Sequence, residues 1–314
     1  MIRRFSPLCC ILLAQMLLLL ILPAASDAQE RFLYDEAGFL VEGEFILEDP
    51  AEGIWQYNSP SLRIDIVRKN DKAQKLIWYE ADIYTQGDER FHMIPKNREK
   101  RMNRMDYMHN IAAENGVVFA LNSDFAHHRI QNKMIPGILI REGEIVSNKT
   151  RNAKSTQFPN LDTLAIFGDG DMKVFRYNEY TAEEYIQMGA ADVLAFGPIL
   201  IRDGETDEKL LSKHGQYREP RSGIGMAGKG HYVAIMVEGR HADSRGMNTA
   251  GLAELFHQKG CTLAFNLDGG LSSAMVFMGR QIVRAGANAK APARSTAEIL
   301  GIGFSAALME TLTP

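Results

Sequence analysis

The sequence predicts an α/β or α+β fold, a single domain in which a mixed β-sheet core is flanked by helices. Three observations lead to this prediction. Strand-like apolar runs outnumber helix-like stretches along the 314 residues, the two kinds follow each other in mixed order, and there is no internal repeat or low-complexity tract. The length fits one large domain or two small ones, and 46% hydrophobic residues are ample for a core.

The N-terminal residues 1–28 are typical of a secretory signal peptide. Arg3 and Arg4 supply positive charge, an apolar run follows, and the small residues up to Ala28 suit cleavage. The apolar run is shorter than the roughly 20 residues that a membrane-spanning helix needs. We therefore expect a periplasmic or extracellular protein without stable membrane insertion after cleavage, with an uncleaved anchor as the alternative.

After the signal peptide we expect an N-terminal extension or edge hairpin at residues 29–60 and one domain at 61–314. Residues 61–67 and 75–83 alternate between apolar and polar side chains, as in two paired strands. Methionines at helical spacing predict a helix over about residues 99–114, ended by a glycine.

The middle of the chain is predicted to be rich in strands. Residues 117–121 form a strand that delivers Asn122 and Asp124 to its carboxyl end. The elements that follow are strand or hairpin segments at 136–141, 144–146 and 192–202, and a short helix at 180–188.

Residues 232–270 are predicted to form a strand, loop, helix, strand unit. The first strand ends in Glu238-Gly239-Arg240, and the second, at 261–265, is followed by Asn266 and Asp268. If the two strands are parallel neighbours, both acids lie at the same edge of the sheet. Open α/β sheets usually bind ligands at that edge.

The segment Asn266-Leu267-Asp268-Gly269-Gly270-Leu271-Ser272-Ser273 is the most informative in the chain. A strand fixes the carboxylate, glycines let backbone N–H groups approach a ligand, and hydroxyls bind anionic or sugar oxygens. The structural alternative is a strand-to-helix connection with an Asx-turn and a serine cap. We favour the functional interpretation because loops at strand ends often carry function.

Several segments share the order of a known family: Ala120–Phe125, Pro136–Gly143, Phe196–Gly204, Arg221–Gly225, Val237–Arg240, Gly246-Met247, Leu252-Ala253 and Asn266–Ser273. In this order they resemble the phosphodiester glycosidase family over about residues 115–304. Its best-known member removes N-acetylglucosamine from a sugar phosphodiester, and bacterial relatives are often labelled exopolysaccharide-biosynthesis proteins. The resemblance implies a hydrolase that cleaves the glycosidic bond of sugar-1-phosphodiesters in envelope or exopolysaccharide glycans.

The chain departs from the family pattern at four places. Leu271 replaces a usual glycine, Glu238 a usual aspartate and Ala126 a usual aromatic residue, while Arg294 is kept without a clear match to the asparagine that often follows it. Because a misplacement of about 1 Å can cost catalysis 10²-fold, the substrate or the activity could differ. A non-catalytic glycan-phosphate binding protein on the same fold is therefore the alternative function.

Residue chemistry suggests how the predicted site would work. Arg221 and Arg240 are the candidates for a clamp on the phosphodiester, because a guanidinium binds phosphate oxygens in pairs. Asp268 is the first choice for the carboxylate that activates water or stabilises charge at C1, with Asp124 or Glu238 as its partner. The predicted catalytic residues are Asp268, Glu238, Asp124 and Arg240, and the predicted substrate-binding residues are Asn122, Arg221, Asn266, Gly269, Gly270, Ser272, Ser273 and Arg294.

Charge and composition limit the partners and cofactors. The net charge of −4 argues against a nucleic-acid partner, and a sugar-phosphate or glycan substrate is expected. Cys9 and Cys10 lie in the signal peptide, which leaves Cys261 as a core residue rather than a nucleophile. No cofactor is certain. His127-His128 beside Asp124 are possible ligands, so a bound divalent cation stays an alternative. A metal-assisted phosphodiesterase that cuts the P–O bond is a chemical variant of the expected hydrolase.

Overall fold

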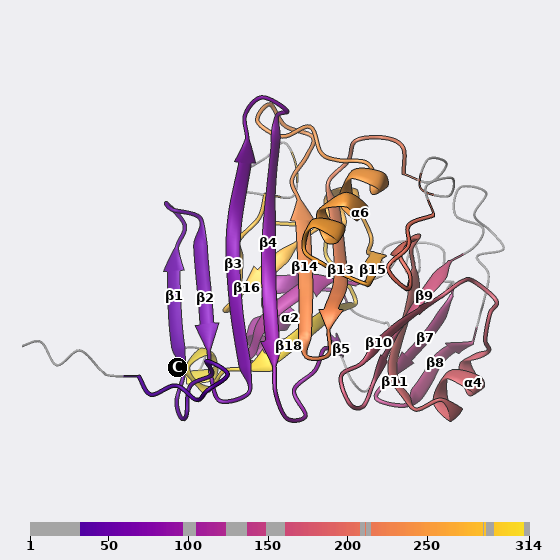
Figure 1. The fold of residues 1–314 in the computed structure, drawn as a ribbon, viewed down its shortest axis with the longest axis horizontal. Helices are drawn as coiled ribbons and strands as arrows, with labels where there is room; N and C mark the ends of the chain where they lie inside the picture. Colours follow the sequence, from indigo (N-terminus) through magenta and orange to yellow (C-terminus); the bar gives the residue numbers. More distant parts are fainter. Residues whose placement is uncertain are drawn as a thin grey trace, which may run out of the picture. The chain divides into compact units, whose positions relative to one another are not determined.

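The structure is a computed structural model that describes residues 32–96, 105–123, 137–148, 161–207, 211, 215–284, 286 and 292–310. The predicted signal peptide, Asp124, Ala126 and the two adjacent histidines lie outside these residues. Within the described part of unit Tyr34–Pro314, three β-sheets account for most of the regular structure (Figure 1).

The large sheet has eight strands and carries the segments that end in the candidate site. Its order is β1 (Phe45–Asp49), β2 (Ile54–Asn58), β3 (Leu62–Asp71), β4 (Leu76–Thr85), β14 (His231–Val237), β13 (Arg221–Gly228), β15 (Leu263–Asn266) and β12 (Ile199–Ile201). The first four strands follow one another along the chain, and β4 then pairs with β14, which comes much later.

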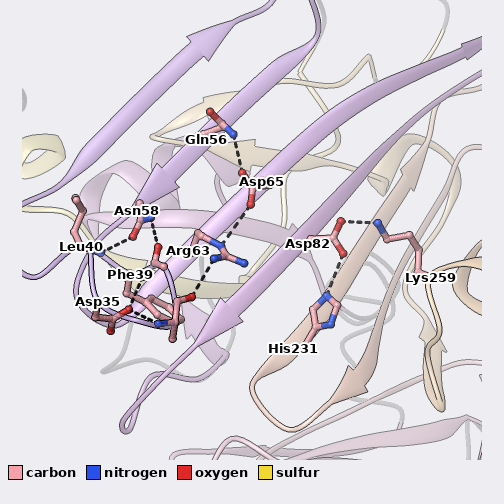
Figure 2. Close-up of polar contacts among 12 residues, drawn as sticks. Asp35, Phe39, Leu40, Gln56, Asn58, Arg63, Asp65, Asp82, His231 and Lys259 are labelled. Carbon is pink, nitrogen blue, oxygen red and sulfur yellow. Dashed lines mark hydrogen bonds and ion pairs between the residues drawn. The ribbon is translucent and has the colours of Figure 1, made fainter. Parts of the chain in front are cut away.

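The strand pair predicted at 61–67 and 75–83 is confirmed as β3 and β4, which pair in antiparallel register. Residues 45–58 form a hairpin at the edge of the same sheet, hydrogen-bonded to β3. Figure 2 shows how polar side chains fasten this edge: the Asn58 amide donates to the carbonyl of Gly38 (2.9 Å), and its oxygen accepts from the backbone N–H of Leu40 (3.0 Å).

Figure 2 also shows a polar link between the large sheet and a helix. Asp82 on β4 contacts His231 on β14 at 3.1 Å and the ammonium group of Lys259 at 2.5 Å. Lys259 is the C-cap of α6 (Thr249–Gln258), so this carboxylate ties the end of the helix to two strands.

Two five-stranded sheets complete the fold. The C-terminal sheet has the order β17 (Arg280–Gln281), β16 (Met275–Phe277), β6 (Val117–Asn122), β18 (Glu298–Phe304) and β5 (His92–Pro95). The small sheet has the order β10 (Met172–Phe175), β9 (Asp162–Phe167), β11 (Ala190–Phe196), β7 (Ile138–Arg141) and β8 (Glu144–Asn148). β7 and β8 are the hairpin that the sequence predicts.

The helices in the described part of the chain are short. Besides α6 they are α2 (Met108–Glu114), α4 (Ala182–Gln187), α7 (Ala306–Glu310) and the 3-10 helix η1 (Gly270–Ser272). The helix expected over 99–114 has its described part only from Met108, because Asp106 pairs with Thr296 in a β-bridge and residues 97–104 lie outside the description. α6 packs on the large sheet, α2 on the C-terminal sheet and α4 on the small sheet, and these short helices are all that the described residues show of the predicted flanking layer.

The prediction of a mixed sheet is wrong for the described strands, whose pairings are all antiparallel. The reason lies in the predicted strand-helix-strand unit. β14 and β15 do run parallel, but β13 lies between them and pairs with both in the opposite direction. None of the described helices is long and apolar enough to cross a bilayer.

The large sheet is buried on both faces where β12, β13, β14 and β15 form it, whereas β1 to β4 leave one face partly exposed. One face, which includes Ile224 and Phe265, packs into a core shared with the other two sheets. The opposite face packs against α6, where Phe256 lies in a second core with Cys261. The prediction that Cys261 is a core residue is confirmed, and burial raises the pKa of its thiol to about 12.

Candidate functional site

Three strand ends meet at one edge of the large sheet. Arg221, the first residue of β13, pairs in register with Val237, the last of β14, and Gly223 pairs with Asn266, the last of β15. The acids that follow β14 and β15 therefore leave the sheet at the same edge, and Arg221 starts between them. The antiparallel β13 is what places an arginine there.

The loops beyond these strands touch because glycines leave room for backbone contacts. The N–H of Gly270 donates to the carbonyl of Pro220 at 2.9 Å. A Cβ on Gly239 would lie 2.8 Å from the nitrogen of Pro220 and 2.9 Å from the Cα of Gly246. No side chain fits at that point, so glycine at 239 is a condition for the contact between the loops.

Arg221 is held in a largely buried position by neutral carbonyl groups. Its Nε donates to the carbonyl of Met247 (3.1 Å), and its Nη2 donates to those of Gly215 (3.2 Å) and Tyr217 (3.1 Å). Burial is the main cause that lowers the pKa of Arg221; nearby Arg240 lowers the pKa further and Glu219 raises it. The guanidinium stays charged, since even a shifted arginine ionises far above neutral pH.

The remaining nitrogen of Arg221 points to the glycine pair. Nη1 lies 3.5 Å from the position that a Cβ on Gly269 would take. Within the described part of the chain, Nη1 has no hydrogen-bond partner, so two N–H groups remain available beside the turn.

Arg240 approaches the same turn from the end of β14. Its Nε donates to Glu219 at 2.5 Å, while Nη2 and Nη1 lie 3.1 and 3.5 Å from the position of a Cβ on Gly270. Neither terminal nitrogen has a hydrogen-bond partner among the described residues. The backbone of Arg240 is left-handed (φ 64°), which is unusual for a residue other than glycine and typical of functional sites.

Asp268 precedes the glycine pair, and its backbone contacts the end of β6 in the C-terminal sheet. It is 8% exposed, and its backbone N–H donates to the carbonyl of Ser123 at 3.2 Å. The side chain of Asn122 donates to the Asp268 carbonyl (2.8 Å) and accepts from the N–H of Ala274 (3.0 Å). Asn122, predicted to bind substrate, thus uses its amide to hold both sides of the turn in place.

Several polar atoms around the turn are buried without a partner. They are Oδ1 of Asn266 and the hydroxyl oxygens of Ser222 and Ser273. The other end of the Asn266 amide donates to the carbonyl of Gly197 at 2.8 Å, which fixes its orientation. Buried polar atoms without partners cost free energy and are rare, and here they gather along β13, β15 and the turn.

The remaining predicted residues lie at the border of the turn. Ser272 ends η1 and is half-buried. Arg294 donates its backbone N–H to the carbonyl of Leu271 at 2.8 Å, so the segment around it lines the turn. The side chain of Leu271 is 42% exposed.

Glu238 is placed differently from Asp268. It is 5% exposed, and its carboxylate accepts hydrogen bonds from Tyr79 and the backbone of Arg284, with His241 as a third partner. Sequence reasoning did not single out Tyr79, His241 or Arg284, nor Glu219, the ion-pair partner of Arg240. Tyr79 and Arg284 are far from the predicted residues in the sequence and no local pattern marks them, whereas Glu219 and His241 lie close to Arg221 and Arg240 and could have been noticed.

The described residues form no metal centre, and a cavity lies away from the predicted site. Among the described residues there is no group of three or more His, Cys, Asp and Glu side chains suited to a metal ion. A cavity of about 570 Å³ lies at the opposite ends of β13 and β15, lined by Met226, Gly228, Leu263 and Lys173 among others. None of the predicted site residues lines this cavity. The side chains of Arg221 and Arg240, which converge on the glycine pair, mark the site instead.

Comparison with known proteins agrees with the arrangement of these segments. The family model of phosphodiester glycosidase matches residues 115–303. A prophage-derived protein of Bacillus subtilis, YomE, described as uncharacterized, is 25% identical over 259 residues. That match covers 82% of this chain and 38% of YomE, so the chain spans well under half the length of this relative.

Two solved structures share the fold. The catalytic domain of zebrafish N-acetylglucosamine-1-phosphodiester alpha-N-acetylglucosaminidase, auto-inhibited by its pro-peptide, matches with a TM-score of 0.62 and 19% identity, over 79% of this chain and 85% of that one. A hypothetical protein from Synechocystis matches with a TM-score of 0.55 and 13% identity, over 79% of this chain and 63% of the other.

Proposed function

The chain belongs to the phosphodiester glycosidase family, and from this premise we propose that it is a secreted hydrolase of sugar-1-phosphodiesters. Its proposed substrates are phosphodiester-linked sugars of envelope or exopolysaccharide glycans, and the bond that breaks is the glycosidic C–O bond. The proposed periplasmic or extracellular location follows from the N-terminal sequence.

The observation that carries the proposal is the pair of arginines at the glycine turn. Terminal nitrogens of Arg221 and Arg240 lie beside Gly269 and Gly270 and have no hydrogen-bond partners among the described residues. Two adjacent cations repel each other, and Arg240 contributes to the lowered pKa of Arg221. A phosphodiester, with one negative charge and two free oxygens, would relieve this repulsion and accept the available N–H groups.

The chemistry proposed for this site needs two kinds of group. The arginines stabilise the negative charge that grows on the leaving phosphate as the C–O bond breaks. Asp268 activates water or stabilises positive charge at C1 of the sugar. Because a phosphate monoester is a good leaving group, we assign the larger share of the rate enhancement to the arginines. Asp124 remains the proposed partner acid.

The test is hydrolysis by the purified mature protein of UDP-N-acetylglucosamine and a panel of sugar-1-phosphodiesters. Asp268→Asn keeps the shape and removes the charge, and we expect it to lower kcat by at least 10²-fold. Arg240→Ala is expected to raise KM and lower kcat. Arg68→Ala, which removes an exposed arginine on β3, is the control and should leave both constants unchanged.

Reaction in ¹⁸O-labelled water identifies the broken bond. Label in the released sugar supports the proposed C–O cleavage, whereas label in the phosphate indicates the phosphodiesterase variant. If no substrate turns over but binding is saturable and is weakened by Arg240→Ala, the protein is the glycan-phosphate binding module instead.

A further inference from the structure

Glu238 is a buried carboxylate that three separate segments surround. Its Oε1 accepts from the hydroxyl of Tyr79 on β4 (3.2 Å) and from the backbone N–H of Arg284 after β17 (2.9 Å). Its Oε2 lies 3.1 Å from Nε2 of His241, whose side chain is only 2% exposed. Each carboxylate oxygen therefore has a protein partner, and little of the group reaches solvent.

The backbone of Glu238 is fixed as well. Its N–H donates to the carbonyl of Ile77 (2.9 Å), and its own carbonyl accepts from the hydroxyl of Ser244 (2.7 Å). The same hydroxyl accepts from the N–H of Ile77 at 3.1 Å. The two ends of the loop 238–244 are thus joined to each other and to β4.

Two connections run from this carboxylate to the glycine turn. On one side, Gly239 leads directly to Arg240, whose guanidinium lies beside Gly270. On the other side, Arg284 donates through Nε to the carbonyl of Gly286 (2.8 Å). Gly286 lies against Leu271: a Cβ on this glycine would be 2.9 Å from Leu271 Cδ2. Both connections end at the turn that follows Asp268.

The Tyr79 hydroxyl and the Arg284 N–H both donate to the Glu238 carboxylate. Burial first, and the nearby Glu238 second, raise the pKa of Tyr79 above its ordinary value, so the phenol keeps its proton and donates. A carboxylate with such donors is stable in a buried place, but removing its charge or its donors would leave polar groups unpaired. The Glu238 carboxylate therefore joins Tyr79 on β4, His241 in its own loop and Arg284 after β17.

We propose that Glu238 is a positioning residue, which sets the place of Arg240, and of Arg284 with Gly286, against the glycine turn without touching the substrate. This inference rests on the proposed anion clamp. It assigns the catalytic carboxylate to Asp268 and gives Glu238, His241 and Tyr79 a shared supporting role.

The test is a double-mutant cycle with inorganic phosphate as the probe, measured by calorimetry on the mature protein. Glu238→Gln is expected to weaken phosphate binding about tenfold, because the Arg240 guanidinium is no longer held. In an Arg240→Ala background the same change should have a much smaller effect, because only the connection through Arg284 and Gly286 is left to lose. Glu89→Gln changes another largely buried carboxylate, bonded to Ser61 and Gly303, and should leave phosphate affinity unchanged.

Hydrogen exchange of the same variants gives a readout that does not depend on a ligand. In Glu238→Gln the amides of residues 239–244 and of Arg284 should exchange faster while the midpoint of global unfolding changes little. Equal losses of affinity in both backgrounds, or unchanged exchange in these segments, would overturn the positioning role. If the unmutated protein binds no phosphate, the clamp itself is wrong, and the exchange data alone decide whether Glu238 orders the two segments.

Discussion

At the scale of single residues, Arg221 shows why a lysine cannot do the same work. Its guanidinium donates to three carbonyl groups and still keeps Nη1 beside Gly269. A lysine has one nitrogen, which cannot reach the carbonyls of Met247 and Gly215 and a ligand at once. The planar fork both anchors the side chain and leaves a donor for the substrate.

We therefore expect Arg221→Lys to weaken phosphate binding by about tenfold or more, although the charge is conserved. Calorimetric titration with inorganic phosphate measures this effect. A surface replacement of the same kind, Arg68→Lys, should bind like the unmutated protein. Equal affinity in Arg221→Lys would show that charge alone, and not geometry, holds the anion.

The sequence identified much of the site at this scale but not the roles within it. Arg240 and the glycine pair were recognisable because they follow apolar runs, and Arg221 because its segment resembles the family; the structure brings Arg221, Arg240 and the Gly269-Gly270 turn together. The side chain of Asn122 turned out to bind backbone, and Glu238 is enclosed by partners. Such contacts join residues far apart in the chain, so spacing could not reveal them.

At the scale of elements, β13 depends on the absence of side chains on one face. A Cβ on Gly225 would lie 2.6 Å from the carbonyl oxygen of Leu263 and 3.0 Å from the ring of Phe256 on α6. The backbone oxygen cannot move without disturbing the β13–β15 ladder. Glycine here allows the helix to lie directly on the strand.

Gly225→Ala should accordingly lower the free energy of unfolding by roughly 1–3 kcal/mol, the usual cost of overpacking. Gly228→Ala is the matched control on the same strand, since a Cβ there meets nothing within 4 Å. Urea denaturation of the two variants measures the difference. If both variants unfold at the same urea concentration, the contact between β13 and α6 is looser than described.

The elements themselves were predictable where periodicity was strong. β3, β4, the β7–β8 hairpin and α4, with its capping box of Thr181 and Glu184, lie where alternation or helical spacing placed them. Of the helix predicted from the methionine stripe, the described part begins at Met108, after Asp106, which pairs with Thr296. That bridge depends on a distant strand, which local periodicity does not report.

At the scale of the whole molecule, buried phenols make stability sensitive to alkaline pH. Burial raises the pKa of Tyr185 and Tyr232 to about 12 and also raises those of Tyr57 and Tyr79. In the unfolded chain a tyrosine ionises near pH 10. Between these values the folded protein binds more protons than the unfolded chain, so stability falls as pH rises above about 10.

Each such tyrosine should lower the free energy of unfolding by up to ~1.4 kcal/mol per pH unit in that range. Urea denaturation at pH 8, 10 and 11, with tyrosinate absorbance as a second signal, measures the loss. Tyr232→Phe should show a shallower dependence than the unmutated protein when each is compared with its own stability at pH 8. A denaturation midpoint that stays constant from pH 8 to 11 would contradict this prediction.

The overall architecture was only partly predictable. The sequence predicted an α/β or α+β domain in which strands outnumber helices; strands do dominate the described residues, and the family is confirmed. The direction of strand pairing could not be predicted. The sequence shows that a helix joins β14 and β15, but it does not show that β13 lies between them. Sheet order depends on contacts between segments far apart in sequence, and no pattern within a segment encodes it.

The strand order also has a consequence for the growing polypeptide. When synthesis has reached the end of β12, β4 has only β3 beside it, and β6 has neither of its neighbours, because β14, β16 and β18 are still to come. Of the three sheets, only the small one has all its strands at that stage. The nascent chain thus keeps unpaired strand edges until late, a state that exposes it to aggregation and that chaperones recognise.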